Sequence, residues 1–288
     1  MMNSTSPTVP SSGPSDASTA QRLAFVGGGN MASAIIGGLI ASGHPADRIV
    51  VIEPHAPQAA IVREKFGVQV EAAGGAALEG TQIVVWAVKP QVFGDAAAPC
   101  APFVGGALHL SVMAGIRRDS IAKATGSERI VRAMPNTPAL IGEGIAGLFA
   151  RAAVTADDRA AIEAVLAPTG ETLWVAREGD LDAVTAISGS GPAYVFFFIE
   201  AMMQAAVDMG LAPEQGRRLA LATFKGATSL ARAGDEAPET LRARVTSKGG
   251  TTHAAITAME AAGVKPAIVQ ALRAAQQRAK ELGDEFGG

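Results

Sequence analysis

The sequence predicts an α/β domain with a doubly wound, mainly parallel sheet, followed by an all-α domain. Three observations support this prediction. Short apolar runs alternate with stretches rich in Ala, Leu, Glu and Lys, which is the pattern of βαβ units. The first apolar run ends in three glycines, and after about Gly179 the strand-like runs stop. We therefore divide the chain into a disordered tail at 1–20, an α/β domain at 21–178 and a helical domain at 179–288.

The apolar runs give the expected strands of the first domain. They are short and bounded by polar or glycine-containing segments, as buried strands of a parallel sheet are. The expected strands are residues 23–26, 49–52, 83–88, 108–113, 130–134, 145–149 and 172–175. A helix is expected at 30–41, directly after the glycines.

The second domain is expected to consist of helices at 193–209, 213–233, 238–245, 252–262 and 264–282. Gly210 and Gly263 follow expected helices, and Pro213 opens one, in agreement with helix punctuation. The first of these helices is apolar nearly all round, so it must be buried on every side. We therefore expect the core of this domain to include a second copy of the chain.

Composition excludes several classes of protein. The net charge is −3 with no basic block, which argues against a nucleic-acid partner. The most apolar stretch, 194–203, is shorter than the ~20 residues that span a bilayer, so no membrane helix is expected. Cys100 is the only cysteine and lies in a Pro-flanked run expected to be a loop. A lone cysteine forms no internal disulfide or zinc cluster, so a cytoplasmic protein without a metal site is predicted.

The glycine segment after the first strand carries the first chemical signal. Gly27, Gly29 and Ala32 fill the positions of the G-x-G-x-x-G/A dinucleotide fingerprint. Gly27 permits a tight turn, Gly29 lets the backbone approach a pyrophosphate, and Ala32 keeps the helix close to the sheet. The positive end of the following helix faces the phosphates. A strand, this loop and a helix in sequence predict a Rossmann domain that binds NADPH or NADH.

Glu53 follows the second expected strand, about 20 residues after the fingerprint, where an acidic residue binds the ribose 2′-hydroxyl of NAD. Its carboxylate is expected to repel the 2′-phosphate of NADP. The sequence therefore leans towards NADH here. Nearby His55, Arg63 or Lys65 can still accommodate NADPH.

Later motifs resemble one family. They are AVKP at 87–90, SVMAG at 111–115, RAMPNTPALIGEG at 132–144, AISGSGPAYVFFFIEA at 186–201 and VTSKGGTT at 245–252. Together with VGGGNMA at 26–32, in this order, they resemble pyrroline-5-carboxylate reductase over about residues 22–282. The resemblance implies NAD(P)H-dependent reduction of 1-pyrroline-5-carboxylate to L-proline, the last step of proline biosynthesis, by hydride transfer to the C=N carbon. It also implies a homodimer formed through the helical domain, and in some relatives a ring of dimers.

The resemblance also implies site residues. For the cofactor they are Val26, Gly27, Gly28, Gly29, Asn30, Met31, Ala87, Val88, Lys89, Pro90, Met113 and Ala114. Two more cofactor residues are predicted from the sequence itself: Glu53 from the fingerprint, and Asn136, whose Pro-bounded loop can line the same crevice. For the imino-acid substrate they are Glu178, Ser247, Gly249, Gly250, Thr251 and Thr252. Thr252 matches the hydroxyl that faces the ring nitrogen and is the expected catalytic residue. Lys89 is expected to contact the nicotinamide ribose.

Some positions depart from the resemblance. Lys248 replaces a proline found in many relatives, and Arg244 replaces a polar residue that touches the cofactor in some. Gly74 and Gly75 stand near an asparagine that some relatives place on the adenine side. These departures bear on cofactor preference more than on the type of reaction.

The expected chemistry needs few acid–base groups. A protonated imine is already electrophilic, so the protein mainly orients it and excludes water. Two glycines before a helix expose backbone N–H groups to a substrate carboxylate, although the threonines there can instead be a simple helix cap. Two alternatives stay open. One is a related reductase of another imine or a β-hydroxy acid, with Lys225 as its lysine; the other is a non-catalytic NAD(P)-binding module.

Overall fold

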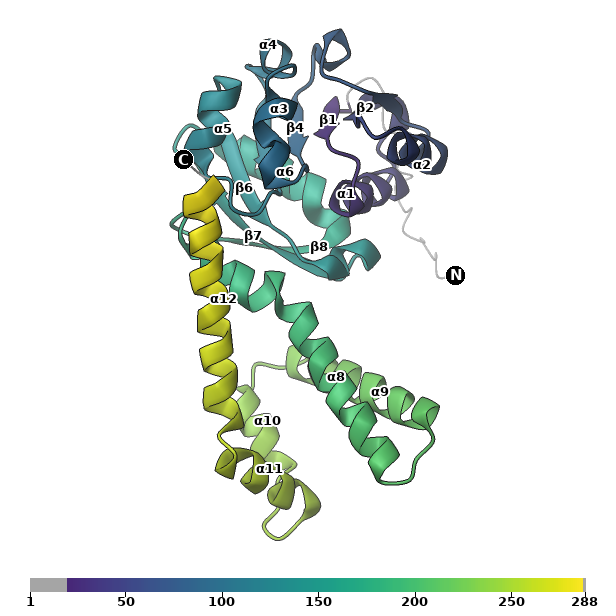
Figure 1. The fold of residues 1–288 in the computed structure, drawn as a ribbon, viewed down its shortest axis with the longest axis vertical. Helices are drawn as coiled ribbons and strands as arrows, with labels where there is room; N and C mark the ends of the chain where they lie inside the picture. The colour runs from purple at the N-terminus through teal and green to yellow at the C-terminus, as the bar shows by residue number, and fades with distance from the viewer. Residues whose placement is uncertain (1–19, 287–288) are drawn as a thin grey trace, which may run out of the picture. The chain divides into compact units, whose positions relative to one another are not determined.

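A computed structural model describes residues 20–286 of the chain (Figure 1). The expected disordered tail, except Ala20, lies outside the described residues. Eight strands form one sheet in the order β3-β2-β1-β4-β5-β6-β7-β8. They are β1 Leu23–Val26, β2 Ile49–Ile52, β3 Gln69–Glu71, β4 Ile83–Trp86, β5 Leu108–Ser111, β6 Ile130–Met134, β7 Gly144–Ala150 and β8 Gly170–Trp174.

The helices that follow and connect the strands are also defined. They are α1 Asn30–Ala41, α2 Ala56–Phe66, α3 Phe93–Ala97, α4 Ala101–Val104, α5 Arg118–Thr125, α6 Ala156–Leu166, α7 Asp180–Val184, α8 Gly191–Asp208, α9 Pro213–Arg232, α10 Pro238–Arg244, α11 Thr251–Ala261 and α12 Val264–Phe286. A π-helical turn, η7 Thr185–Gly189, joins α7 to α8. The predicted fold class, a Rossmann sheet followed by helices, is confirmed.

The parallel arrangement creates a switch point in the sheet. Strand β1 pairs in parallel with β2 on one side and with β4 on the other, in register from Leu23 to Val26. The strand order reverses there, and ligands of such sheets bind beyond the carboxyl ends of the strands at that point. The glycine fingerprint begins directly after Val26, so it lies at the switch point.

Sequence reasoning missed some elements. Strand β3 has a single buried residue, Val70, between Gln69 and Glu71, so it gives no apolar run. The Pro-flanked run around Cys100 is not simply a loop, because α4 begins at Ala101 and Cys100 is buried. Because the π-turn joins α7 to α8, the helical stretch Asp180–Asp208 is, by length and composition alone, long and apolar enough to cross a membrane. A single helix of this kind does not contradict the expectation of no membrane helix, which stays a prediction.

The described contacts divide the chain into two compact units. Unit 1 comprises residues up to Met113, Arg118–Val131 and Ala150–Pro168; unit 2 comprises Ala114–Arg117, Arg132–Phe149 and the chain from Thr169 onward. In unit 1, α1 packs against α2 and α6. In unit 2, α8 and α9 lie side by side, and α12 contacts α7, η7 and α11 (Figure 1). The predicted boundary at 178/179 stays a prediction.

A neutral histidine lies in the core of unit 1. The Trp86 indole N–H donates a hydrogen bond to His109 Nδ1 (3.0 Å), and His109 Nε2 lies 3.2 Å from the Val104 carbonyl oxygen. Because Nδ1 accepts and the carbonyl needs a donor, the proton is on Nε2. Both rings are fully buried, and burial lowers the pKa of His109 to about 4.

We expect His109 alone to cost the folded state about 2 kcal/mol as the pH falls from about 7 to about 5. The folded-state pKa of about 4 lies below the ordinary value of 6.5, so the unfolded chain takes up the proton first. Stability is therefore complete above about pH 6.5 and is lost towards pH 4. Urea unfolding at the two pH values measures the loss. The control is His109→Asn, which keeps an acceptor near Nδ1 without titrating; an equal loss in both proteins would exclude His109 as the cause.

Candidate functional site

The first turn of the glycine loop requires glycine. Gly27 has a φ of +100°, in the region that only glycine adopts readily. Its N–H donates to the Ile52 carbonyl oxygen (2.8 Å), which holds the turn against β2. A Cβ at this position would lie 2.7 Å from the Ala87 carbonyl oxygen. Both the dihedral angle and the close approach of the β4 end therefore exclude a side chain.

The second fingerprint glycine borders open space. Gly29 is the N-cap of α1 with an extended backbone (φ −70°), and a Cβ there would meet no described atom within 4 Å. Among the described residues, no side chain caps α1 and no acidic residue lies in its first turn. The helix N-terminus therefore offers free N–H groups and a positive dipole end, which fit the pyrophosphate of a dinucleotide. Asn30 and Met31 begin the helix beside this space.

Glu53 is bound to the glycine loop itself. Its Oε2 accepts a hydrogen bond from the Gly28 N–H (2.9 Å), and its Oε1 accepts one from the His55 N–H (2.9 Å). The Gln58 side-chain amide donates to the Gly28 carbonyl oxygen (2.6 Å). The carboxylate is therefore held at the carboxyl end of β2, where the sequence predicts contact with the adenosine ribose.

The other expected cofactor residues of unit 1 lie at neighbouring strand ends. The Ala87 N–H donates to the Val26 carbonyl oxygen (2.8 Å), so β1 and β4 stay paired up to the glycine loop. Lys89 is exposed and precedes Pro90 at the start of a 3-10 turn. Val88 lies against Gly27. These positions line the carboxyl edge of the sheet as predicted.

Met113 and Ala114 form the turn after β5. Met113 is buried, and its N–H donates to the Ser111 hydroxyl (3.3 Å), whereas Ala114 is exposed. The hydrogen bond to Ser111 closes a tight turn at the end of the strand. This turn also stands at a carboxyl end of the sheet, as its predicted contact with the cofactor requires.

The SKGGTT segment forms an open helix N-terminus in unit 2. Gly249 has a φ of +79°, and Gly250 is the N-cap of α11. The Gly250 N–H donates to the Ser247 carbonyl oxygen (3.0 Å), which folds the loop back on itself. In the described chain no side chain caps α11, so the threonines do not serve as the cap. Thr251 is exposed and Thr252 half-buried, and the N–H groups of the first turn stay available to an anion.

Asn136 supports the fold around the MPNTP segment. Its side-chain amide donates to the Ser188 carbonyl oxygen (3.2 Å), and its Oδ1 accepts the Ile145 N–H (3.0 Å). These bonds join the start of β7 to the π-turn within unit 2. Both ends of the amide thus have partners, and the predicted contact of Asn136 with the cofactor stays a prediction.

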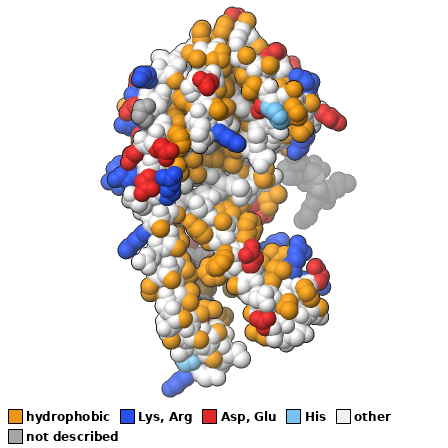
Figure 2. All heavy atoms as spheres, in the orientation of Figure 1, with side chains coloured by type: hydrophobic (Ala, Val, Ile, Leu, Met, Phe, Trp, Pro, Cys, Tyr) orange, Lys and Arg blue, Asp and Glu red, His pale blue; other side chains and the backbone are white. Residues whose placement is uncertain are grey.

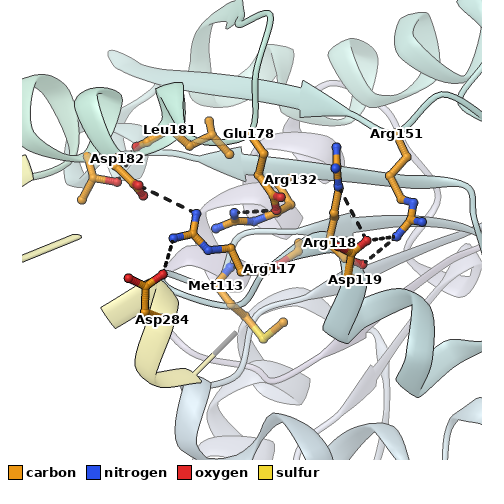
Figure 3. Close-up of polar contacts among 12 residues, drawn as sticks. Met113, Arg117, Arg118, Asp119, Arg132, Arg151, Glu178, Leu181, Asp182 and Asp284 are labelled. Carbon is orange, nitrogen blue, oxygen red and sulfur yellow. Dashed lines mark hydrogen bonds and ion pairs between the residues drawn. The ribbon is translucent and has the colours of Figure 1, made fainter. Parts of the chain in front are cut away.

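Glu178 lies beside a buried arginine that sequence reasoning overlooked. Arg132 Nη1 donates to Glu178 Oε1 (2.9 Å), and the two side chains are 7% and 14% exposed (Figure 3). Burial lowers the pKa of Arg132, and the Glu178 carboxylate opposes that shift. Arg132 Nε finds no hydrogen-bond partner among the described atoms. The signal in the sequence is an arginine in the middle of the apolar strand β6.

A second ion-pair cluster adjoins this pair in unit 2. Arg117 reaches Asp284 on α12 (3.3 Å) and Asp182 on α7 (3.8 Å), as Figure 3 shows. Burial raises the pKa of the Asp182 carboxyl, and Arg117 and Arg132 oppose the shift. The cluster fastens the last helix to the start of the helical segment.

The helices of unit 2 expose a large apolar surface. Figure 2 shows hydrophobic side chains spread over these helices on the face in view. On α8 only Ile199 is buried, while Phe196 and Phe197 are 58% and 70% exposed. Such a surface marks an interaction site. Lys225, the lysine of the alternative reading, is exposed on α9, and Arg244 pairs with Glu236 at α10.

The fold and the glycine cradle define a dinucleotide-dependent oxidoreductase. The family models agree with this class. Residues 22–115 match a model described as NADP oxidoreductase coenzyme F420-dependent, and residues 178–282 match pyrroline-5-carboxylate reductase dimerisation.

Similar proteins identify the family. The chain is 42% identical over 268 residues to pyrroline-5-carboxylate reductase of Pseudomonas aeruginosa, covering 92% of this chain and 98% of the relative. The reductase structure from Coxiella burnetii has a TM-score of 0.86 at 36% identity and covers 92% and 99% of the two chains. A Plasmodium falciparum pyrroline carboxylate reductase with NADP bound has a TM-score of 0.81 at 29% identity, covering 91% and 98%. The chain belongs to the pyrroline-5-carboxylate reductase family, as its motifs predicted, and is an NAD(P)H-dependent oxidoreductase.

Proposed function

We propose that this enzyme reduces 1-pyrroline-5-carboxylate to L-proline, the last step of proline biosynthesis, with NAD(P)H. The observation that carries the proposal is the pair of open helix N-termini, each preceded by glycines: α1 after Gly29 and α11 after Gly250. The first fits the pyrophosphate of the cofactor, and the second fits the carboxylate of the imino acid. The family membership supplies the reaction that joins them.

Each part of the α11 N-terminus has a role in the proposal. The N–H groups after Gly250 bind the substrate carboxylate, and Gly249, with its positive φ, makes the turn that precedes them. The Thr252 hydroxyl donates to or accepts from the ring nitrogen and orients the C=N bond. Bound NAD(P)H supplies the hydride that adds to the C=N carbon. Orienting an activated imine accounts for most of the protein's contribution.

Thr252→Ala is expected to lower kcat/KM for the imine by about 10- to 100-fold while the Kd for NAD(P)H changes little. The reason is that the hydroxyl touches the substrate and not the cofactor. Initial rates at 340 nm give kcat/KM, and nucleotide fluorescence gives Kd.

Two variants control this experiment. Thr257→Ala makes the same change at an exposed position further along α11 and is expected to keep parental activity. Thr252→Ser retains the hydroxyl and is expected to recover most of it. Parental kcat/KM in Thr252→Ala would remove the threonine from the mechanism.

The assembly and location complete the proposal. The exposed apolar side chains of α8 pair with those of a second copy to form a homodimer. A ring of dimers and a cytoplasmic location are the further parts of the proposal, and they rest on the family resemblance. Burial of Phe196 and Phe197 at about 25 cal/mol per Å² favours the homodimer. Two observations support the dimer: residues 178–282 match a family model for dimerisation, and the helices expose an apolar surface. Glu178, which pairs with Arg132, is also proposed as a substrate residue.

A further inference from the structure

We infer that this enzyme discriminates against NADPH and uses NADH, through a carboxylate that the glycine loop itself holds in place. NADPH differs from NADH only by a 2′-phosphate on the adenosine ribose. In this class of fold that ribose lies at the carboxyl end of the second strand. The inference rests on the proposed function only in taking a nicotinamide dinucleotide as the cofactor.

Glu53 is held in a fixed position. Two backbone N–H groups, of Gly28 and His55, hold its two oxygens at 2.9 Å each. A carboxylate held by two backbone donors cannot swing away at little cost. A Cβ on Gly28 would lie 3.4 Å from Glu53 Oε2, so the carboxylate lies directly against the loop. A 2′-phosphate arriving there meets a fixed negative charge.

A second carboxylate, that of Glu71 on β3, lies on the neighbouring strand. Strand β3 pairs in parallel with β2, with Glu71 opposite Ile52, and the Glu53 N–H donates to the Glu71 carbonyl oxygen (2.8 Å). The ends of both strands therefore carry acidic residues at the same edge of the sheet. The two carboxylates carry the same sign of charge as a phosphate and repel it. Because the site is only partly exposed, solvent and salt screen this repulsion only in part.

The segment directly after β3, residues 72–75, has no side chain that can donate a hydrogen bond. Residues 72–75 read Ala-Ala-Gly-Gly. Gly74 packs so closely on the next segment that a Cβ would lie 2.6 Å from Cys100 Sγ and 2.8 Å from its backbone nitrogen. A longer residue with an amide or hydroxyl cannot replace it without moving that backbone. This segment therefore supplies no side chain to bind a phosphate.

Two basic side chains of α2, Arg63 and Lys65, have contacts of their own. Arg63 Nη2 donates to the Val70 carbonyl oxygen (3.2 Å), and Lys65 Nζ lies 5.1 Å from the centre of the Phe66 ring. Both lie in the last turn of α2, away from its N-terminus beside the ribose position. His55 is exposed, but its backbone N–H already supports Glu53. Arg63 and Lys65 thus have other contacts, and NADPH gains no arginine clamp of the kind that binds 2′-phosphates.

The test measures binding without substrate. Titration of the parent enzyme with NADH and with NADPH, followed by nucleotide fluorescence, is expected to give a Kd at least about tenfold lower for NADH. In Glu53→Gln, which is close in shape but uncharged, the Kd for NADPH is expected to fall by about tenfold and that for NADH to rise a few-fold. Glu64→Gln, an exposed residue on α2, is the control and should keep the parental ratio.

Each outcome decides the inference. Equal or tighter binding of NADPH by the parent enzyme overturns it, and so does an unchanged ratio in Glu53→Gln. Melting temperatures of all three proteins in the absence of nucleotide show whether a variant has lost its fold. If Glu53→Gln has lost its fold, Glu53→Asp replaces it in the test. Glu53→Asp keeps the charge on a shorter side chain and is expected to keep the preference for NADH. Binding with the expected preference but without turnover of the imine would leave this inference standing and remove the proposed function.

Discussion

Gly29→Ala is expected to raise the Kd for NAD(P)H by about 10- to 100-fold while the melting temperature of the nucleotide-free enzyme stays almost unchanged. The backbone at Gly29 is extended and acceptable to alanine, and the added methyl group would touch no described protein atom. The space that it fills is the approach of the pyrophosphate to the N-terminus of α1. Fluorescence titration and thermal unfolding measure the two quantities.

Gly27→Ala is the matched comparison for this prediction. The same methyl group there would lie 2.7 Å from the Ala87 carbonyl oxygen, on a backbone with a φ of +100°. Both stability and cofactor affinity are therefore expected to fall, by about 1–3 kcal/mol for stability. If Gly29→Ala lowered the melting temperature as much as Gly27→Ala, or left the Kd unchanged, the space beside Gly29 would not be the cofactor site.

Arg132→Met is expected to destabilise the folded chain by about 3–5 kcal/mol, because it removes the arginine that neutralises the largely buried Glu178 carboxylate. The ion pair has a distance of 2.9 Å, and both side chains are mostly enclosed. Exposed ion pairs such as Arg177–Asp180 contribute little by comparison. Urea unfolding measures the loss.

The double variant Arg132→Met/Glu178→Leu gives the contrasting result. With both charges removed, the desolvation cost disappears, and most of the lost stability should return. The same protein tests the predicted place of Glu178 in the substrate site. If its KM for the imine is parental, Glu178 acts only through the fold; a raised KM in a stable protein supports contact with substrate. A double variant no more stable than the single one would contradict the buried-pair interpretation.

The Rossmann fold could be predicted because its signals are local. Strands such as 23–26 and 49–52 are continuous apolar runs, and helix α9 starts at Pro213 as its punctuation predicted. Strand β3 could not be predicted, since one buried valine in three residues gives no period. The π-turn η7 was also missed, because it depends on packing within the helical unit and leaves no pattern in the sequence.

The site was predictable to the level of segments. Gly27 and Gly250 predict tight turns before helices, so the two helix N-termini were expected. The partners of individual side chains were not. That Glu53 binds the Gly28 N–H depends on the loop folding back towards β2. That Glu178 faces Arg132, 46 residues earlier in the sequence, is a long-range contact without a local signal.

The way in which the chain passes between its two units limits how the enzyme can be divided. Six segments alternate between the units, so the backbone crosses from one to the other five times. Strands β7 and β8 belong with the helices, although α6, which connects them, belongs with the glycine loop. A gene fusion that joined the nucleotide-binding part of one reductase to the helical part of another at a single junction would therefore separate residues that pack together. Recombination among relatives should therefore preserve function only when it exchanges interleaved blocks.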